Sequence, residues 1–400
     1  MQKGKPVIVF GKHIYLDSMG KIVAFSYYDL FECFAILQTH IDTGAKGYFI
    51  GYLTYEAGVI LQIHNKPLFK KLLNKILERE KVVGLPLAHF ELFASRKRFF
   101  LQDATPMSEK DSDTTLFKPL KNLDKNAYKK HFQQIKQHLA IGDSYQVNYT
   151  QEIYLQRLGD LSNEDLFRSL CKQQNAPYKS FIKTDFDSII SLSPELFFKI
   201  KRRKITTQPM KGTIRRSGKD DIDKKLKNQL SMDKKSQSEN VMIVDLLRND
   251  LSRIPNIKKV KVKELFKVHT YPTLHQLVST IEAKLPKNYK ILDIFLALLP
   301  CGSITGAPKL RTLEIIESLE NRRRGIYCGA IGLISRKKIL FNVPIRTLVK
   351  HSNEELFRYG VGSGIVWDSK LNEELEELIL KCTFLKIADQ SNFKLMFSLN

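Results

Sequence analysis

The segment Leu196–Arg216 limits the possible folds more than any other part of the chain. Its first half alternates apolar and polar residues, which predicts two strands joined by the basic turn Lys201–Lys204. Pro209 then ends regular strand pairing because proline has no backbone N–H to donate. Gly212 allows the backbone to come close to a bound molecule. We therefore expect an antiparallel hairpin followed by a short anion-facing loop that carries Lys211.

Lys211 has two interpretations. Most of the many lysines in this chain must lie on the surface, and Lys211 can be one of them. A lysine that is desolvated and close to other cations has a lowered pKa and can act as a nucleophile. The Pro-Met before it and the Gly-Thr-Ile-Arg-Arg after it favour an anion-binding loop, but spacing alone leaves both interpretations open.

The length of 400 residues predicts two subdomains or one large two-layer unit. We place a boundary in the polar, aperiodic segment Gln102–Thr115, which gives an N-terminal α+β region over residues 1–115 and a second domain over residues 120–390. No apolar run reaches the roughly 20 residues that span a bilayer, and the N-terminus does not resemble a signal peptide. Five scattered cysteines argue against structural zinc and disulfides. These features predict a cytoplasmic protein that has no membrane segment.

The formal net charge of +23 has two explanations. Basic proteins can bind nucleic acid through the release of phosphate counterions. The basic residues here form small groups at expected hairpin tips and helix ends, without the interleaved aromatic side chains that stack on bases. We attribute most of the charge to solvated surface and to a funnel for a small anionic substrate. Nucleic acid binding is the weaker alternative.

A carboxylate follows a strand break in the apolar segment Ser188–Ile200, which is interrupted by Ser193-Pro194-Glu195. Strand ends often present functional side chains. A carboxyl group held between apolar walls has a raised pKa that suits general acid catalysis. The alternative for Glu195 is an ordinary turn glutamate.

Two predicted helices, Asp233–Arg253 and Leu371–Ala388, carry further carboxylates. In the second helix, Glu374, Glu377 and Lys381 form a stripe beside the apolar one. The simple interpretation is a charged flank with an ion pair between Glu377 and Lys381. The alternative is a pair of carboxylates that bind a hard cation such as Mg²⁺.

Three more segments have features of an anion site. Pro300–Lys309 precedes the predicted helix Leu310–Asn321, so free backbone N–H groups and the helix dipole would face an anion. Tyr359–Val366 is predicted to be a glycine-rich turn whose amides hold a carboxylate. The predicted strand Gly142–Ile153 has an amide-rich polar face, which either meets solvent or lines a site.

Taken in order, these segments resemble the chorismate-utilising enzymes, a family that comprises the anthranilate, aminodeoxychorismate, isochorismate and salicylate synthases. The match runs from about Lys125 to Ala388. It rests on Ser193-Pro194-Glu195, Glu239–Asp250, Gly306-Ala307-Pro308-Lys309, Ile345-Arg346-Thr347 and Gly362–Val366. The resemblance implies an α+β fold of two packed antiparallel sheet layers flanked by helices, with the chorismate-binding catalytic domain over residues 120–390.

Two positions distinguish the activities within this family. Lys211 lies where anthranilate synthases usually carry alanine and where the aminodeoxychorismate type carries a nucleophilic lysine. Gln146 lies where the isochorismate and salicylate enzymes carry a lysine that activates water. The run Gly51–Gly58 also looks like the aminodeoxychorismate type. The resemblance thus implies amination of chorismate at C4 by ammonia, through a covalent Lys211 adduct, with anthranilate formation as the alternative.

The resemblance implies a role for each matched residue. Lys211 attacks C2 of the ring, Glu195 protonates the departing C4 hydroxyl, and His275 positions the ring. Mg²⁺ is bound by three carboxylates, from Glu239, Glu374 and Glu377. The other substrate contacts are implied at Gln146, Gly212, Thr213, Ser303, Tyr327, Arg346, Gly362, Ser363, Gly364 and Lys381.

The resemblance also implies partner proteins, and the chain departs from the family pattern at one position near the metal ligands. The chain carries no glutaminase or lyase segment, so ammonia is expected from a separate glutamine amidotransferase subunit, and a separate lyase is expected to act on the product. Ser236 occupies a position that is usually acidic in the family. Serine cannot supply that charge, which predicts weaker metal binding or a water ligand.

Overall fold

The computed structural model describes residues 8–100, 115–174, 176–271 and 274–388. Except for Thr115, the expected boundary segment Gln102–Thr115 lies outside these residues. None of the described helices is long and apolar enough to cross a membrane.

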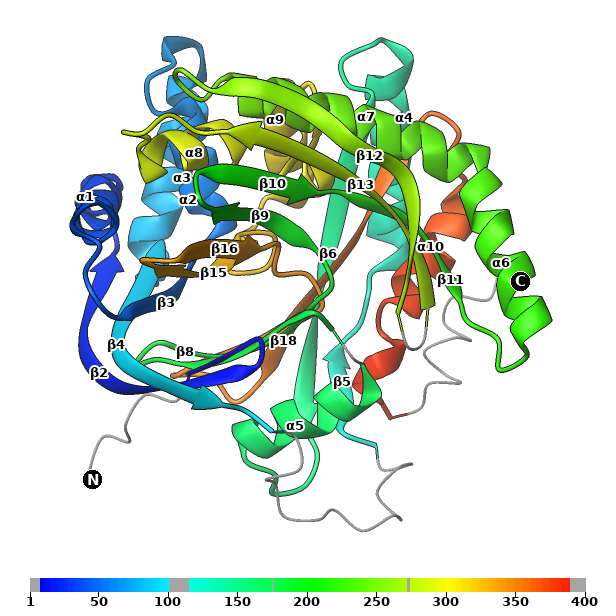
Figure 1. Ribbon diagram of the computed structural model, residues 1–400. Helices are drawn as coiled ribbons and strands as arrows, with labels where there is room; N and C mark the ends of the chain where they lie inside the picture. Colours follow the sequence, from blue (N-terminus) through cyan, green and yellow to red (C-terminus); the bar gives the residue numbers. More distant parts are fainter. Residues whose placement is uncertain (1–7, 101–114, 175, 272–273, 389–400) are drawn as a thin grey trace.

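The strands and helices follow one another along the chain as in Figure 1. The strands are β1 (Ile8–Phe10), β2 (His13–Ala24), β3 (Tyr48–Leu53), β4 (Ala88–Arg98), β5 (Phe117–Lys121), β6 (Gln146–Arg157), β7 (Tyr178–Lys183), β8 (Asp187–Ser193), β9 (Leu196–Lys201), β10 (Lys204–Gln208), β11 (Met210–Arg215), β12 (Lys258–Thr270), β13 (Leu274–Lys284), β14 (Gly306–Ala307), β15 (Ala330–Ser335), β16 (Lys338–Asn342), β17 (Thr347–His351) and β18 (Phe357–Val366). The α-helices are α1 (Tyr27–Thr43), α2 (Tyr55–Ile63), α3 (Lys70–Val83), α4 (Lys125–Ala140), α5 (Asn163–Gln173), α6 (Asp220–Met232), α7 (Lys234–Ser252), α8 (Ile291–Leu298), α9 (Lys309–Glu320) and α10 (Leu371–Leu380).

Antiparallel pairs connect these strands into one curled sheet that forms two layers, so the expected α+β architecture is confirmed (Figure 1). In one layer, β12 pairs with β13, β13 with β10 and β11, β10 with β9, β9 with β16, and β16 with β15. In the other, β1 pairs with β7, β7 with β8, β8 with β17, β17 with β18, and β18 with β6. Strands β2, β3 and β4 join the two layers.

Strands from both sides of the expected domain boundary pair directly. From the N-terminal region, β3 pairs with β15 and β1 pairs with β7. Both regions therefore contribute strands to the same sheet. The division into domains over residues 1–115 and 120–390 stays a prediction.

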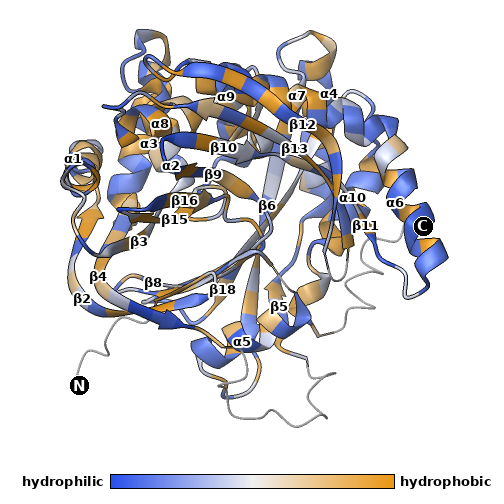
Figure 2. Ribbon diagram, viewed as in Figure 1, coloured by the Kyte–Doolittle hydropathy of each residue, from blue (hydrophilic) through white to orange (hydrophobic). Residues whose placement is uncertain are grey.

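Two apolar clusters hold these layers together. One lies between the layers and includes Ile50, Ile189 and Leu333. The larger one lies under the helices, where the ring of Phe295 on α8 packs 5.3 Å from Phe198 and 5.0 Å from Phe341, measured between centroids. In Figure 2 the helices show one orange and one blue side, as expected for elements that cover a sheet. The five cysteines are buried and free, as expected.

Three elements differ from the sequence-based expectation. The glycine-bracketed run Gly47–Gly58, whose sequence predicts one buried strand, is divided between two elements. Strand β3 ends at Leu53, and α2 begins at Tyr55 after the N-cap Thr54, whose hydroxyl accepts a hydrogen bond from the backbone of Ala57. The expected glycine-rich turn Tyr359–Val366 makes up all of strand β18 except its first two residues. The last helix ends at Leu380, well before Ala388.

The expected anion site before α9 is not formed as predicted. Pro308 is the N-cap of α9, and Lys309 turns inward, where its Nζ lies 2.6 Å from Oδ2 of Asp250. Both side chains are almost completely buried, and two backbone carbonyls accept further hydrogen bonds from the same ammonium group. Lys309 therefore fastens α9 to α7 and α8.

Replacing Lys309 by alanine should lower the free energy of unfolding by about 3 kcal/mol, because Asp250 would keep a buried charge without its close cation. Urea denaturation measures this loss. Arg253→Ala is the matched control: Arg253 lies 3.6 Å from the same carboxylate but is 44% exposed, so its loss should cost less than about 1 kcal/mol. Equal losses in the two variants would contradict a structural role specific to Lys309.

Candidate active site

Most of the predicted site residues meet at one cavity of about 170 Å³. Its walls come from β6, β11, β18 and α10, in the right half of Figure 1, and from the segments beside β9 and β17. The predicted residues that line it are Glu195, Lys211, Gly212, Thr213, Ser303, Tyr327, Arg346, Gly362, Gly364, Glu377 and Lys381. The chain thus brings an amine, two carboxylates and a guanidinium group to one small space.

Lys211 enters this cavity from strand β11, not from the loop that the sequence suggested. The pairing of β11 with β13 shifts register beside Gly212, which has a φ of +69°. A Cβ at that position would lie 2.4 Å from Oγ of Ser236, so only glycine fits the bulge. Lys211 Nζ lies 3.4 Å from Oε1 of Gln146 and 3.6 Å from Oε2 of Glu239.

Gln146 supports the amine of Lys211 from strand β6. Its side chain is fully buried, and Nε2 has no hydrogen-bond partner within the described parts of the chain. A Cβ at Gly364 would lie 3.2 Å from Lys211 Nζ and 3.3 Å from Gln146 Nε2. A buried donor without a partner costs free energy, so this amide is available to an acceptor on a bound molecule.

Glu195 is the most strongly perturbed acid of the cavity. Burial raises its pKa to about 7, although a hydrogen bond from Ser303 and the charges of Lys211 and Lys381 oppose that effect. Ser303 Oγ donates to Glu195 Oε1 at 2.6 Å. A carboxyl group with this pKa is partly protonated near neutral pH and can donate a proton. The raised pKa expected for Glu195 from the sequence is confirmed.

Positive charge lines another part of the cavity. Arg346 has a φ of +52°, a conformation that residues other than glycine seldom adopt, and its guanidinium group donates to Oε1 of Gln174 at 3.0 Å. Lys381 Nζ donates to the carbonyl oxygen of Gly362 at 2.7 Å and lies 2.6 Å from Oε1 of Glu377. These two cations suit the carboxylates of a small dianion.

The glycines of strand β18 line the cavity with their backbone atoms. It pairs with β6 along its length, whereas its described pairing with β17 covers only Arg358 and Tyr359. A Cβ at Gly360 would lie 2.3 Å from the ring of Tyr327, and one at Gly362 would lie 2.5 Å from Thr150. Glycine here therefore allows close packing of a strand.

Two of the three predicted metal ligands lie beside lysines of the cavity, Glu239 beside Lys211 and Glu377 beside Lys381. Glu374 is buried and accepts a hydrogen bond from Ser369 at 2.7 Å; burial and the nearby charge of Glu377 raise its pKa. Burial alone would raise the pKa of Glu377, but the charges of Lys381 and Lys211 together have a larger, opposite effect. The pKa of Glu377 is therefore lowered. Among the described residues, no group of three or more His, Cys, Asp or Glu side chains is placed to hold a metal ion.

Two predicted contacts are not at the cavity. His275 points to the other side of β13, where Nε2 lies 3.0 Å from Oδ1 of Asp223 and Nδ1 lies 3.0 Å from Oγ1 of Thr270. This agrees with the general expectation that a lone buried histidine is structural, and it corrects the role near the ring implied by the resemblance. Ser363 turns toward α4, where its Oγ lies 2.9 Å from the hydroxyl of Tyr128.

The sequence reasoning missed Gln276, which does line the cavity. Its Nε2 donates to the sulfur of Met210 at 2.9 Å. Since side chains alternate along a strand, the placement of His275 on one face of β13 already placed Gln276 on the other. Asn148 on β6 also lines the cavity and was noted in the sequence only as part of a polar strand face.

Comparisons with known proteins agree with this site. The family model described as chorismate binding enzyme matches residues 14–386. The chain is 38% identical over 304 residues to the aminodeoxychorismate synthase component 1 of Escherichia coli (strain K12), which covers 76% of this chain and 65% of that protein. It is 39% identical over 257 residues to the protein of the same name from Klebsiella aerogenes, covering 64% of this chain and 56% of that protein. The chain thus spans less than two thirds of the length of these relatives.

The solved structures that it resembles show the same fold. Anthranilate synthase component I from Streptococcus pneumoniae superposes with a TM-score of 0.74 at 22% identity, covering 96% of this chain and 93% of that one. An isochorismate synthase from Bacillus anthracis gives a TM-score of 0.72 at 18% identity, with 96% of each chain covered. With the family match over nearly the whole chain and the cavity that its blocks form, the chain belongs to the family of chorismate binding enzymes.

Proposed function

We propose that this protein aminates chorismate at C4 with ammonia to give 4-amino-4-deoxychorismate. The observation that carries the proposal is the presence of a lysine amine and a buried carboxyl group of pKa about 7 in one cavity. The relatives named aminodeoxychorismate synthase component 1 support it. Gln146, in place of a water-activating lysine, is a further reason to prefer an amine over water as the nucleophile.

The chain's own groups can carry out both halves of this reaction. Arg346 and Lys381 bind the carboxylates of the substrate. These contacts also fix the orientation of the substrate ring in the cavity. The amine of Lys211 forms a bond to C2, both ring double bonds shift (C1=C2 to C1=C6 and C5=C6 to C4=C5), and the C4–O bond breaks. Glu195 protonates the departing hydroxyl, which leaves as water, and its carboxylate then takes the proton released by the Lys211 nitrogen.

Ammonia completes the exchange. Its nitrogen forms a bond to C4, both double bonds shift back, and the bond between C2 and Lys211 breaks. The proton that the ammonia nitrogen loses passes to the leaving Lys211 nitrogen, which restores the free lysine. The enolpyruvyl group stays on the product, so loss of pyruvate requires a separate lyase. The names of the relatives contain "component 1", which supports a second component; we propose a glutamine amidotransferase that supplies the ammonia.

We also propose that the protein works in the cytoplasm, because its five buried cysteines are free thiols, as is usual in a reducing compartment.

We propose Mg²⁺ as the cofactor of Glu239, Glu374 and Glu377, whose carboxylates would have to move closer together to bind it, since no group of three among the described residues is placed to hold a metal ion. The carboxylate of Glu374 is buried. Burial and the charge of its neighbour Glu377 raise its pKa, so the protein supplies too little positive charge near this carboxylate. Burial lowers the pKa of Lys235, but the charges of Glu374 and Glu239 raise it, and the net shift is upward, so both carboxylates lie near the same ammonium group. When bound to Glu239, Glu374 and Glu377, Mg²⁺ would supply a hard positive charge for a substrate carboxylate.

Product analysis tests the proposal. Purified protein with chorismate, Mg²⁺ and ammonium should yield 4-amino-4-deoxychorismate, identified by chromatography and mass spectrometry, and removal of Mg²⁺ by EDTA should lower the rate at least about tenfold. A zinc-free buffer that contains Ca²⁺ in place of Mg²⁺, at equal ionic strength, is the control for the effect of salt concentration on the rate. Anthranilate as the product would overturn the proposed amination at C4 in favour of amination at C2, and isochorismate would overturn amination altogether.

A further inference from the structure

The carboxylates of the proposed Mg²⁺ site already have cations of the protein beside them. Glu239 lies 3.6 Å from Nζ of Lys211, and Glu377 lies 2.6 Å from Nζ of Lys381. Glu374 is buried, and no described side chain forms an ion pair with it. A buried carboxylate without a close cation costs free energy, so any further positive charge near Glu374 matters for this site.

Lys235 brings a third ammonium group to these carboxylates. It lies in the first turn of α7, and Glu239 follows it four residues later on the same face of the helix. Its Nζ lies 3.5 Å from Oε2 of Glu373, the residue before Glu374 in the first turn of α10. The ammonium group of Lys235 therefore stands between a predicted metal ligand on α7 and another on α10.

The charge of Lys235 acts on the carboxylates of α10. Burial raises the pKa of Glu374, and the charge of Lys235 opposes that rise. The same charge opposes the effect of burial at Glu377. A positive charge that favours the ionised form of a carboxylate partly neutralises it. Lys235 thus already supplies some of the positive charge that a metal ion would bring to these two side chains.

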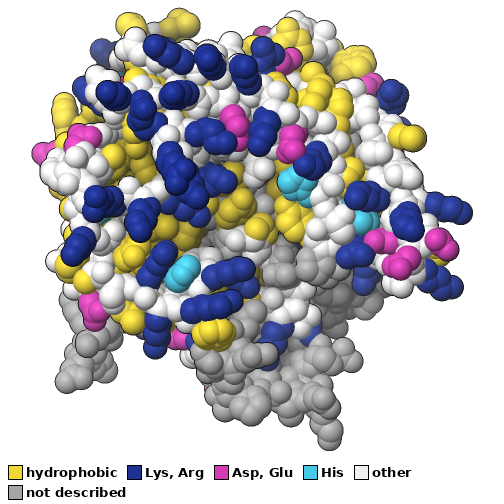
Figure 3. All heavy atoms as spheres, in the orientation of Figure 1, with side chains coloured by type: hydrophobic (Ala, Val, Ile, Leu, Met, Phe, Trp, Pro, Cys, Tyr) yellow, Lys and Arg dark blue, Asp and Glu magenta, His cyan; other side chains and the backbone are white. Residues whose placement is uncertain are grey.

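The surroundings of the site do not strengthen its attraction for a divalent cation. Mg²⁺ needs its oxygen ligands to converge at about 2.0–2.1 Å, whereas carboxylates that pair with separate ammonium groups have no reason to converge. Ser236, beside Lys235, adds no negative charge. The chain carries a net charge of +23, and Lys and Arg side chains dominate the face shown in Figure 3. A field of this sign weakens the binding of cations.

We propose that Lys235 is a built-in counter-ion that competes with Mg²⁺ for Glu239 and Glu374. In the metal-free protein, its ammonium group partly neutralises these carboxylates and joins α7 to α10 through Glu373. When Mg²⁺ binds, the ammonium group moves out to solvent, which the long flexible side chain allows because it is 47% exposed. Lys235 therefore weakens metal binding and stabilises the metal-free site. This role depends on the Mg²⁺ site of the proposed function.

A titration with Mn²⁺ tests the proposal without turnover. Mn²⁺ takes the same oxygen ligands as Mg²⁺, and electron paramagnetic resonance measures the free ion directly. At constant ionic strength and without chorismate, Lys235→Gln should bind Mn²⁺ about three- to tenfold more tightly than the wild type, because the competing charge is gone and the carboxylates remain. Lys235→Arg keeps the charge, so its affinity should stay within about twofold of the wild type.

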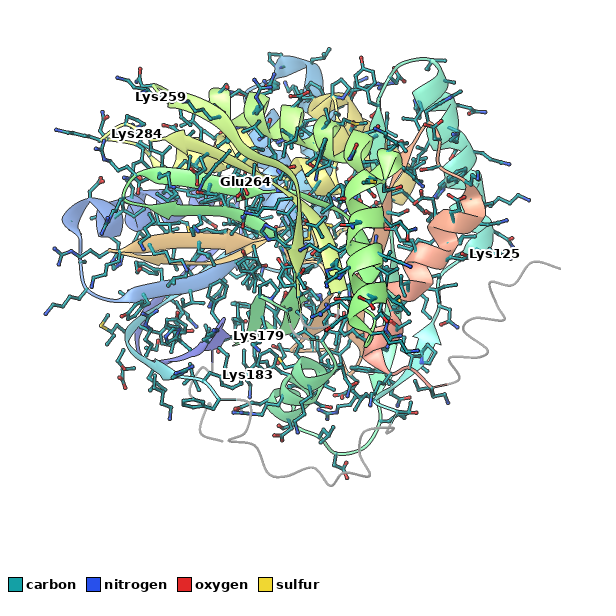
Figure 4. The ribbon with its side chains drawn as sticks, turned by 45° about the vertical axis from the view of Figure 1, so that its right-hand side comes forward. Lys125, Lys179, Lys183, Lys259, Glu264 and Lys284 are labelled. Atoms are coloured by element: carbon teal, nitrogen blue, oxygen red, sulfur yellow. The ribbon has the colours of Figure 1, made fainter. Side chains whose placement is uncertain are left out.

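Two control variants remove a lysine elsewhere. Lys370→Gln takes away the other cation of Glu373, which lies 3.0 Å from its Oε1 but is 76% exposed. Lys284→Gln removes the same charge far from the site: in Figure 4, Lys284 lies at the upper left and α10, in salmon, lies in the right half. Each should change the Mn²⁺ affinity less than about twofold, since exposed charges are screened by solvent and salt.

Thermal unfolding gives a second measure. Without metal, Lys235→Gln should have a lower Tm than the wild type, because Glu374 loses a charge that offsets its burial. Saturating Mg²⁺ should then raise the Tm of Lys235→Gln by about 1 °C or more beyond the rise in the wild type, since tighter binding to the folded state stabilises it more.

The outcomes separate this role of Lys235 from the metal site itself. Equal or weaker Mn²⁺ binding in Lys235→Gln would overturn the competition and leave the metal site in place. Tightening of the same size in Lys284→Gln would also overturn it, because the effect would then come from net charge alone. No Mn²⁺ binding in any variant would overturn both this role and the Mg²⁺ site on which it depends.

Discussion

Lys211→Ala should lower the rate of chorismate amination by about 1000-fold or more if the proposed covalent route operates, because the variant lacks the group that would form the intermediate. The amine of Lys211 reaches into the cavity beside Gln146, and alanine leaves that space empty. Chorismate should still bind, since Arg346 and Lys381 are unchanged. The loss should therefore appear in kcat rather than in KM, measured by steady-state kinetics with ammonium.

Lys381→Ala is the matched control, because it removes a second lysine from the same cavity. Lys381 contacts Gly362 and Glu377 and serves binding, so its loss should raise KM for chorismate about tenfold with a smaller change in kcat. Rapid quenching and mass spectrometry should detect a chorismate adduct in the wild type and in Lys381→Ala, and none in Lys211→Ala. An adduct-free wild type, or a Lys211→Ala variant with nearly normal kcat, would refute covalent catalysis and leave direct attack by ammonia.

The sequence predicted those elements whose signals are local. Pro194 and Glu195 interrupt the apolar segment where β8 ends and β9 begins, and the hairpin of β9 and β10 turns at the expected basic residues. Helix α7 lies between its cap residues Asp233 and Arg253, as expected. The apolar spacing of this helix predicts one buried face that includes Val241 and Leu247; Leu247 is buried, but Val241 is 39% exposed. A helical stripe identifies a face, and its edges depend on what packs against it.

Long-range packing explains the errors. Three glycines in a short segment predicted a turn, yet Gly360 and Gly362 belong to a strand and make room for Tyr327 and Thr150. Nothing in the segment itself reveals that requirement. The insertion of β3 between β4 and β15 is likewise determined by contacts across some 280 residues of sequence, which local periodicity does not contain.

The candidate site shows the same division. Motifs that match the family identified the amine of Lys211 and the carboxyl of Glu195, and the fold brings both to one cavity. The role of His275 near the ring came from the resemblance alone, without knowledge of which face of the strand meets the site. Gln276 faces the cavity and His275 faces Asp223, since consecutive residues of β13 point to opposite sides.

Glu195→Gln should lower kcat/KM about 100- to 1000-fold, because glutamine fills the same space and cannot donate a proton to the departing hydroxyl. Burial raises the pKa of Glu195 to about 7. The protonated form, which is the active one for the first step, therefore predominates below pH 7 and is lost as the pH rises. In the wild type, kcat/KM should fall above pH about 7, and in Glu195→Gln this descending limb should be absent.

Ser303→Ala separates the acid from its hydrogen bond. Ser303 donates to Glu195 and thereby favours the charged form, which lowers the pKa of that carboxyl group. Removing the hydroxyl should raise the pKa and move the descending limb to higher pH by about half a unit to one unit, while most of the activity remains. A descending limb that stays in Glu195→Gln, or that moves to lower pH in Ser303→Ala, would assign the proton to a different group of the cavity.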